Sequence, residues 1–202
     1  MEDHGKVDAS EFWSWFAANQ AAYRHLTEYR ESLLHPLEDR LSALADGLTY
    51  EISKEMKGIC ELVIGVSGRE NLIPIAKSVV AQAPDLPGWA VRALRPPQGF
   101  AFIHNLEGFR FDPRGMRFDP MSNESNPSAL GLRVFVPEYG KAGADRALKA
   151  VWNILDTALG EEACLREVKY LEVCPAPPSV DGAEHLPLSE LPAYIEWSHR
   201  KG

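Results

Sequence analysis

Residues 60–66, Cys-Glu-Leu-Val-Ile-Gly-Val, and residues 48–52, Leu-Thr-Tyr-Glu-Ile, both place apolar side chains at every second position. This alternation is typical of β-strands with one buried face. A Lys-Glu-Met-Lys-Gly turn lies between the two stretches, so we expect them to form a hairpin. An amphipathic helix is then predicted over residues 70–82, and a third strand over residues 89–95. The first half of the chain therefore contains a strand–strand–helix–strand unit.

The same order of elements occurs a second time. The two copies span residues 48–97 and 109–175, and each contains a glycine turn and ends its last strand at a proline. In the second copy, Asp112-Pro113-Arg114-Gly115 has the composition of a type I turn. It predicts a hairpin in which Arg110 faces Arg117. The copy is completed by a strand, a helix and a strand, expected at residues 130–136, 143–160 and 166–173.

Further helices are expected outside the two copies, over residues 10–28, 36–46 and 189–200. Asp8 and Ser10 are available as N-caps of the first, and Pro36 suits the first turn of the second. The predicted fold class is α+β, with two ββαβ units forming a mixed, mainly antiparallel sheet that has helices on one face. The whole chain, residues 1–202, is expected to be a single domain with an internal pseudo-repeat.

The charge of the chain limits its partners. Its 202 residues carry a net charge of −8, and an acidic chain attracts phosphate backbones and anionic lipids poorly. We therefore expect no nucleic-acid partner and no membrane partner. The N-terminal residues lack the basic start and apolar stretch of a secretory signal. The cysteines, Cys60, Cys164 and Cys174, have no paired spacing, so a cytoplasmic location is the simplest interpretation.

No sequence pattern predicts a metal site, a cofactor or a catalytic residue. The six histidines are scattered, and no two have the three- or four-residue spacing that places two ligands on one helix face. The cysteines form no Cys-x-x-Cys pair. No glycine-rich cofactor loop or catalytic triad stands out.

A candidate anion site lies where the second strand meets the following helix, at Ser67, Gly68 and Arg69. The preceding residues give this stretch a likeness to a nucleophile elbow, but Arg69 stands where the second glycine is required. One interpretation makes Ser67 a turn or helix-cap residue. The alternative is an anion site formed by backbone N–H groups at the helix start together with Arg69.

A candidate binding face is formed by arginines that strand alternation places opposite the main apolar side chains: Arg92, Arg110, Arg117 and Arg133. Glu51 and Glu61 share the corresponding face of the first hairpin. In a single sheet, that face would be acidic on one half and basic on the other. Two interpretations stay open. The arginines pair internally with Asp112, Asp119 or the two glutamates, or they bind an acidic partner or an anionic ligand.

Three motifs follow one another along the chain: Phe12-Trp13-Ser14-Trp15-Phe16, Ala83-Pro84-Asp85-Leu86-Pro87-Gly88-Trp89 and Leu191-Pro192-Ala193-Tyr194-Ile195-Glu196-Trp197. Together they resemble an uncharacterised family of bacterial proteins, and the match spans nearly the whole chain. The resemblance implies one full-length unit. It implies no established activity, cofactor or catalytic residue.

Two functional hypotheses follow. The first is a non-catalytic cytoplasmic protein-interaction protein of the immunity or regulator type, supported by the acidic charge and a sheet face free to bind. The alternative is a hydrolase or small-anion-binding enzyme with its site at the seam between the two ββαβ units. Arginines and the loops at residues 96–108 and 120–129 would line that site. A homo-oligomer is compatible with either hypothesis.

Overall fold

The structure is a computed structural model that describes residues 7–24, 31–121, 129–177 and 185–201. Within it the chain divides into two compact units, Met1–Arg95 and Pro96–Gly202, which are treated separately below. The division falls next to the end of the first predicted repeat. Helices and mixed sheets occur in both units, so the predicted α+β class is confirmed. The expectation of a single domain stays a prediction.

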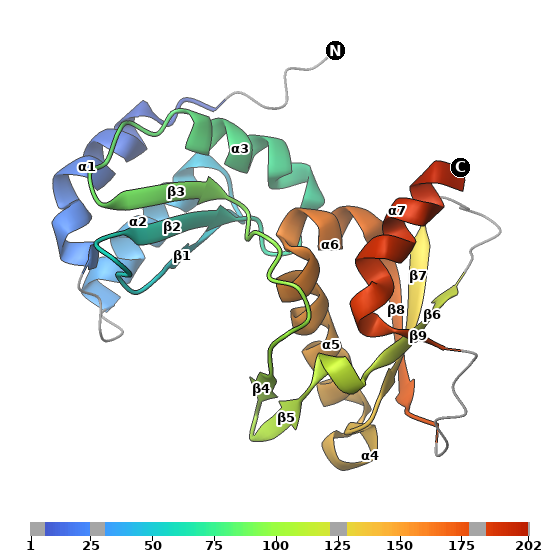
Figure 1. The fold of residues 1–202 in the computed structure, drawn as a ribbon. Coiled ribbons are helices and arrows are strands. Elements are labelled where there is room, and N and C mark those ends of the chain that lie inside the picture. The colour runs from blue at the N-terminus through green and yellow to red at the C-terminus, as the bar shows by residue number, and fades with distance from the viewer. Residues whose placement is uncertain (1–6, 25–30, 122–128, 178–184, 202) are drawn as a thin grey trace. The chain divides into compact units, whose positions relative to one another are not determined.

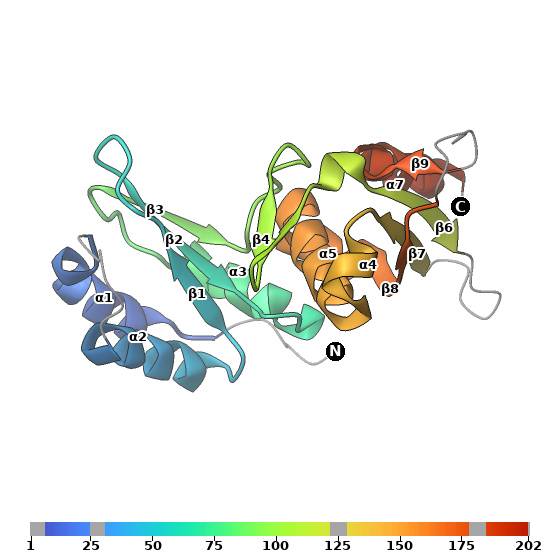
Figure 2. The same ribbon diagram turned by 90° about the horizontal axis from the view of Figure 1, so that it is seen from below.

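The first unit contains a three-stranded sheet in the order β1-β2-β3 (Figure 1). β1 pairs antiparallel with β2, and β2 pairs parallel with β3. The helices α1 and α2 lie side by side (Figure 2). The elements are, in chain order, α1 (Ser10–Arg24), α2 (Glu31–Leu44), β1 (Thr49–Ile52), β2 (Cys60–Gly65), the 3-10 helix η1 (Glu70–Leu72), α3 (Ile73–Ala81) and β3 (Trp89–Ala93).

Aromatic residues of α1 anchor the core of the first unit. Phe12, Trp13 and Phe16 are buried, and Trp15 is partly buried, whereas the opposite face of the helix is exposed. The Trp13 Nε1–H donates to the carbonyl of Val79 in α3 at 2.8 Å, and the Phe16 ring packs edge-on against Trp89 of β3. Asp8 and Ser10 flank the N-cap position, which is Ala9, since the Ala9 carbonyl accepts from the Trp13 N–H at 3.0 Å; Asp8 Oδ1 accepts from the Ser10 N–H at 3.0 Å. Residues 25–28 of the predicted helix lie outside the described residues.

The second helix begins earlier than predicted. α2 starts at Glu31, so Pro36 lies inside the helix instead of in its first turn. A proline there cannot donate to the preceding turn. Two tyrosine hydroxyls bind other carbonyls of the preceding turn: Tyr23 donates to the Leu33 carbonyl at 2.7 Å, and Tyr50 donates to the Leu34 carbonyl at 3.1 Å. Sequence periodicity could not show these long-range bonds.

The second unit contains a four-stranded sheet in the order β8-β7-β6-β9 and a separate hairpin, β4-β5. β6 is antiparallel to both β7 and β9, whereas β7 and β8 are parallel. The elements are β4 (His104–Leu106), β5 (Phe109–Phe111), the 3-10 helix η2 (Pro113–Gly115), β6 (Arg117–Met121), β7 (Leu130–Val136), α4 (Tyr139–Ala142), α5 (Ala144–Leu159), α6 (Glu161–Glu167), β8 (Val168–Pro175), β9 (Leu186–Pro187), the 3-10 helix η3 (Leu188–Glu190) and α7 (Leu191–Lys201).

One face of the four-stranded sheet forms the core of the second unit with the helices α5, α6 and α7, which gather beside the strands in Figure 1. Phe118 of β6 and Leu132 of β7 are fully buried there, together with Ile154 of α5 and Leu191 of α7. The opposite face carries the polar residues of the strands. No helix in the described part of the chain has both the length and the apolar character needed to cross a membrane.

The predicted hairpin across residues 112–115 is wrong. Asp112 Oδ1 accepts from the Arg114 N–H at 3.1 Å and begins a 3-10 turn with Pro113 buried. This turn sends the flanking strands into different sheets, so Arg110 lies opposite Asn105 and Arg117 lies opposite Phe135. The described strands belong to three sheets, and the expectation of two ββαβ units in one sheet is therefore not confirmed.

Candidate protein-interaction site

The tip of the β1–β2 hairpin is the most exposed apolar feature of the first unit. Met56 and Ile59 form a β-bridge, with N–H···O distances of 2.9 and 3.0 Å in the two directions. The loop between them consists of Lys57 and Gly58 alone, with φ values of +53° and +82°. Positive φ at both loop positions is the geometry of a type I′ turn, whose twist matches that of the flanking strands. We call residues 54–59 the hairpin tip.

Two large apolar side chains of the hairpin tip face solvent together. Met56 is 74% exposed and Ile59 is 50% exposed. Because they lie directly opposite each other in the ladder, their side chains are on the same side of the hairpin. Single exposed apolar residues are ordinary on protein surfaces. Here two of them lie next to each other, and the β-bridge and the tight turn fix their relative position, so they form a small contact surface.

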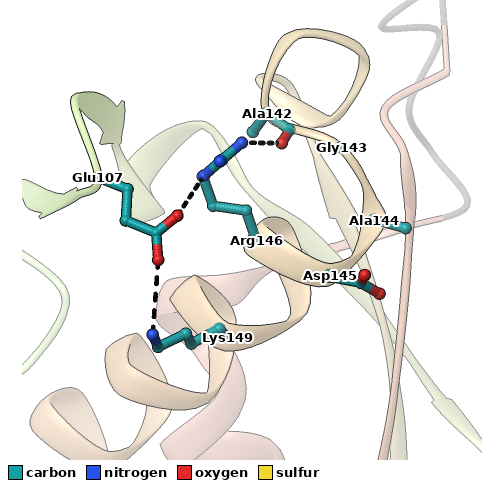
Figure 3. Close-up of a pocket in the computed structure, with 7 residues that line it drawn as sticks. All are labelled: Glu107, Ala142, Gly143, Ala144, Asp145, Arg146 and Lys149. Carbon is teal, nitrogen blue, oxygen red and sulfur yellow. Dashed lines mark hydrogen bonds and ion pairs between the residues drawn. The ribbon is translucent and has the colours of Figure 1, made fainter.

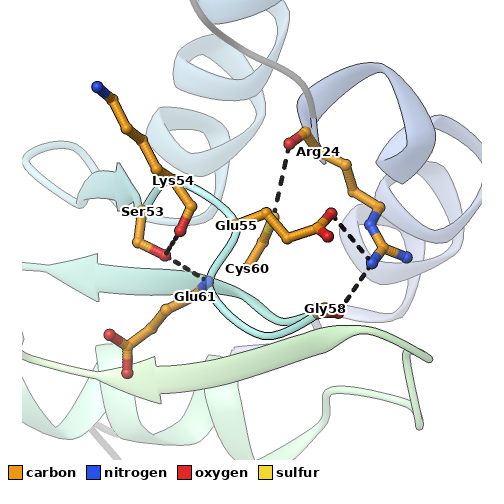
Figure 4. A network of polar contacts seen from close by, with 7 residues as sticks. All are labelled: Arg24, Ser53, Lys54, Glu55, Gly58, Cys60 and Glu61. Carbon is orange, nitrogen blue, oxygen red and sulfur yellow. Dashed lines mark hydrogen bonds and ion pairs between the residues drawn. The ribbon is translucent and has the colours of Figure 1, made fainter.

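Arg24, the last described residue of α1, holds the hairpin tip in place (Figure 4). Its Nη2 donates to the Gly58 carbonyl at 2.9 Å and forms an ion pair with Glu55 at 3.3 Å. The Cys60 thiol lies 3.7 Å from the Arg24 carbonyl, and burial raises the pKa of that thiol. Gly88 leaves room for the guanidinium, since a Cβ there would lie 2.5 Å from Arg24 Nη1.

Ser53 links the two strands where the hairpin tip begins. Its Oγ accepts from the Glu61 N–H at 2.9 Å and donates to the Lys54 carbonyl at 3.1 Å. The Lys54 ammonium points away from this network (Figure 4). Among the residues that the structure describes, neither Lys54 nor Lys57 has an ion-pair partner, and both are exposed. The hairpin tip therefore combines an apolar pair with two unneutralised cations.

The four arginines of the predicted binding face do not form one group. Arg117 and Arg133 share the polar face of the four-stranded sheet, whereas Arg110 belongs to the β4–β5 hairpin and Arg92 to the first unit. The expected internal pairing is confirmed for Arg92, which binds Glu61. Arg133 pairs with a different carboxylate, Glu172, at 3.0 Å.

The predicted division of the sheet faces into an acidic and a basic half is not found. In the first unit, Arg92 and Arg95 neutralise Glu61 and Glu51, the second pair at 2.6 Å. In the second unit, Arg117 Nη1 donates to the carbonyl of His185 at 3.1 Å, and the His185 ring lies 2.8 Å from Asp119. The polar side chains of each face therefore contact groups on the same face or next to it, so neither face presents a separate acidic or basic half.

The candidate anion site at Ser67, Gly68 and Arg69 forms a tight turn. Ser67 and Gly68 have positive φ values of +46° and +85°, and the Arg69 N–H donates to the Val66 carbonyl at 3.0 Å. The Arg69 guanidinium binds Asp46, at 2.8 Å from its carbonyl and 3.0 Å from its carboxylate. This geometry fits the turn interpretation. An anion at this position would compete with Asp46 for Arg69.

A cavity of ≈ 320 Å³ lies in the second unit where the β4–β5 turn meets the start of α5 (Figure 3). Glu107 at the turn forms ion pairs with Arg146 at 2.9 Å and with Lys149 at 3.6 Å. The Asp145 side chain points away from Glu107. The Arg146 guanidinium also lies 4.7 Å from the Phe109 ring centroid. The hydrogen bond from Arg146 lowers the pKa of Glu107, so this carboxylate is held in its charged form.

No set of three His, Cys, Asp or Glu side chains within the described ranges is arranged to bind a metal ion. Comparison with protein-family models, curated proteins and solved structures gave no match for this chain. The resemblance to an uncharacterised bacterial family stays a prediction. The function must therefore be argued from the residues themselves.

Sequence reasoning missed the hairpin tip as a candidate site. The sequence predicts only a turn at residues 54–58, because the strand pattern stops at Ile52 and resumes at Cys60. One signal was present: the Lys-Gly dipeptide has an apolar residue on each side. In a two-residue hairpin loop these flanking residues must face each other across the ladder.

Proposed function

We propose that this protein is a non-catalytic, cytoplasmic protein-binding protein of the regulator or immunity type, and that the hairpin tip is its contact surface. The single observation that carries the proposal is the joint exposure of Met56 and Ile59 on a braced two-residue turn. Bracing matters because a contact surface that is already ordered loses less conformational entropy on binding.

The test is capture of a stoichiometric partner by the full-length chain from a lysate of the cells that express it. The purified partner is then measured against the variant Met56→Gln/Ile59→Thr. Both replacements are neutral, and Thr retains strand propensity. Burial of each apolar side chain contributes about 1.5–3 kcal/mol. We therefore expect the double variant to bind at least about 100-fold more weakly, since about 1.4 kcal/mol is a factor of ten.

A matched control is Tyr170→Gln, which removes an exposed side chain of similar size from β8 of the second unit. It should bind the partner as the unchanged chain does. The proposal is wrong when no stoichiometric partner is recovered, or when the double variant binds as tightly as the control.

The cavity beside Glu107 favours a second candidate function, the binding of a small anion. Arg146 and Lys149 line it, and Glu107 occupies the position between them that an anionic ligand would take. In an inorganic phosphate titration followed by NMR, Glu107→Gln should bind phosphate more tightly than the unchanged chain, and Arg146→Gln should not bind it. Equal affinities for all three chains would exclude this function. The alternative of an enzyme with a site between the two predicted repeats stays a prediction.

A further inference from the structure

The hairpin tip carries a charge opposite in sign to that of the whole chain. Among the described residues, Lys54 and Lys57 of the hairpin tip and Arg24 beside it accompany one carboxylate, Glu55. The chain as a whole has a net charge of −8. Arg24 and Glu55 neutralise each other in their ion pair, which leaves the two lysines. At physiological salt the screening length is about 8 Å, so an approaching protein responds to these lysines more than to distant carboxylates.

Lys57 occupies a backbone position that does not favour lysine. Its φ of +53° lies in the left-handed region, where a residue with a Cβ is disfavoured by roughly 1–2 kcal/mol and Asn or Gly is preferred. Glu107 occupies the equivalent position of the β4–β5 hairpin, with φ +50°, and there the side chain pairs with Arg146 and Lys149. Lys57 has no such ion pair within the described residues. A strained residue with no internal pairing points to a role outside the chain.

We infer that the partner of the hairpin tip is a protein with an apolar pocket rimmed by carboxylates. Met56 and Ile59 enter the pocket, while Lys54 and Lys57 pair with the rim. This inference rests on the proposed function and adds the chemistry of the partner. The acidic remainder of the chain repels such a rim, so the hairpin tip is the part that approaches first. Charges of this kind act mainly on the association rate and on the choice of partner.

The test uses the partner purified after capture by the full-length chain. A carbodiimide joins a lysine amine to a carboxylate through an amide bond, and the water that is lost converts the carbodiimide to its urea. We expect cross-linked peptides that join Lys54 or Lys57 to Asp or Glu of the partner. The variant Lys54→Arg/Lys57→Arg keeps both charges but has no amine at these positions. It should lose these cross-links, which shows that they form through the amines of Lys54 and Lys57.

Charge reversal gives the second measurement. Lys54→Glu/Lys57→Glu should associate with the partner about 10-fold more slowly at low salt, and the difference should shrink as salt is added. The control Lys77→Glu/Lys141→Glu has the same change in net charge on α3 and α4 and should associate at nearly the unchanged rate.

The outcomes separate the inference from the proposed function. If Met56→Gln/Ile59→Thr abolishes binding but charge reversal has no effect and no lysine cross-links form, the partner binds the apolar pair without a carboxylate rim. The inference is then wrong and the proposed function stands. Failure to recover a stoichiometric partner contradicts both.

Discussion

The Arg24 guanidinium donates to the Gly58 carbonyl across a 2.9 Å hydrogen bond and so ties the end of α1 to the turn of the β1–β2 hairpin. Arg24→Ala removes this bond and the ion pair with Glu55. We expect faster amide hydrogen exchange in residues 54–59 and a loss of stability of about 1 kcal/mol, typical of one intramolecular hydrogen bond. Arg24→Lys should not restore protection, since both contacts are made by Nη2 and the lysine ammonium ends one bond short of that atom. Unchanged exchange in Arg24→Ala would show that the hairpin tip is rigid without this brace.

Gly88→Ala tests the same brace from the opposite side. Gly88 has φ +80°, and an added Cβ would lie 2.5 Å from Arg24 Nη1. The backbone strain alone costs about 1–2 kcal/mol, and the guanidinium must also move. We expect a lower midpoint in urea unfolding and the same increase in hydrogen exchange at the hairpin tip. The matched control is Gly99→Ala, which also has positive φ but no atom within 4 Å of the added Cβ. It should destabilise the protein without changing exchange in residues 54–59.

Lys57→Asn should stabilise the protein and weaken partner binding. Asn accepts positive φ more readily than Lys, so the hairpin should gain up to about 1 kcal/mol in unfolding free energy. The lost ammonium should slow association with an acidic partner. Glu107→Asn is the comparison at the equivalent turn of the β4–β5 hairpin. There the gain should be smaller, because the ion pairs with Arg146 and Lys149 are lost. Urea unfolding measures both changes, and an equal gain at the two positions would contradict the difference in side-chain roles.

We expect the protein to lose stability at mildly acidic pH because the pKa of His104 is lowered. Burial lowers the pKa of His104 from its ordinary value of 6.5, because the charged imidazolium is poorly solvated beside α5. The unfolded chain therefore takes up a proton near pH 6.5 that the folded chain does not, and stability falls as the pH drops below about 6.5. The melting temperature of the unchanged chain should decrease more between pH 7.5 and 5.5 than that of His104→Gln. Parallel curves for the two chains would show that His104 does not contribute.

The elements that the sequence predicted well have strong local signals. β2 and β7 lie where alternating apolar residues placed them, and α5 begins and ends within one residue of its predicted range. In these elements, the apolar residues that recur at strand or helix spacing are the ones buried in the core, so packing and local sequence pattern favour the same structure. A bond from the Ser10 N–H to Asp8 at the start of α1 also has a local signal, because it involves neighbouring residues only.

The errors arose where distant contacts decide the structure. The turn residues 112–115 were recognised, but their chemistry does not say which strands they join, and β4 is too short at three residues to show alternation. α2 continues through Pro36 while the hydroxyls of Tyr23 and Tyr50 bind carbonyls of the preceding turn. The pairing of Arg133 with Glu172 depends on a register between β7 and β8 that no local pattern contains.

The hairpin tip also has a consequence for how such a protein can diverge. Met56, Lys57 and Ile59 face solvent, while the core of the first unit is built from α1, α2, α3 and the buried positions of β2 and β3. Substitutions at these three positions therefore disturb the core little. Under the proposed function, a lineage can exchange one partner for another by changing a few codons of a single turn, while selection on the remaining chain maintains the same scaffold.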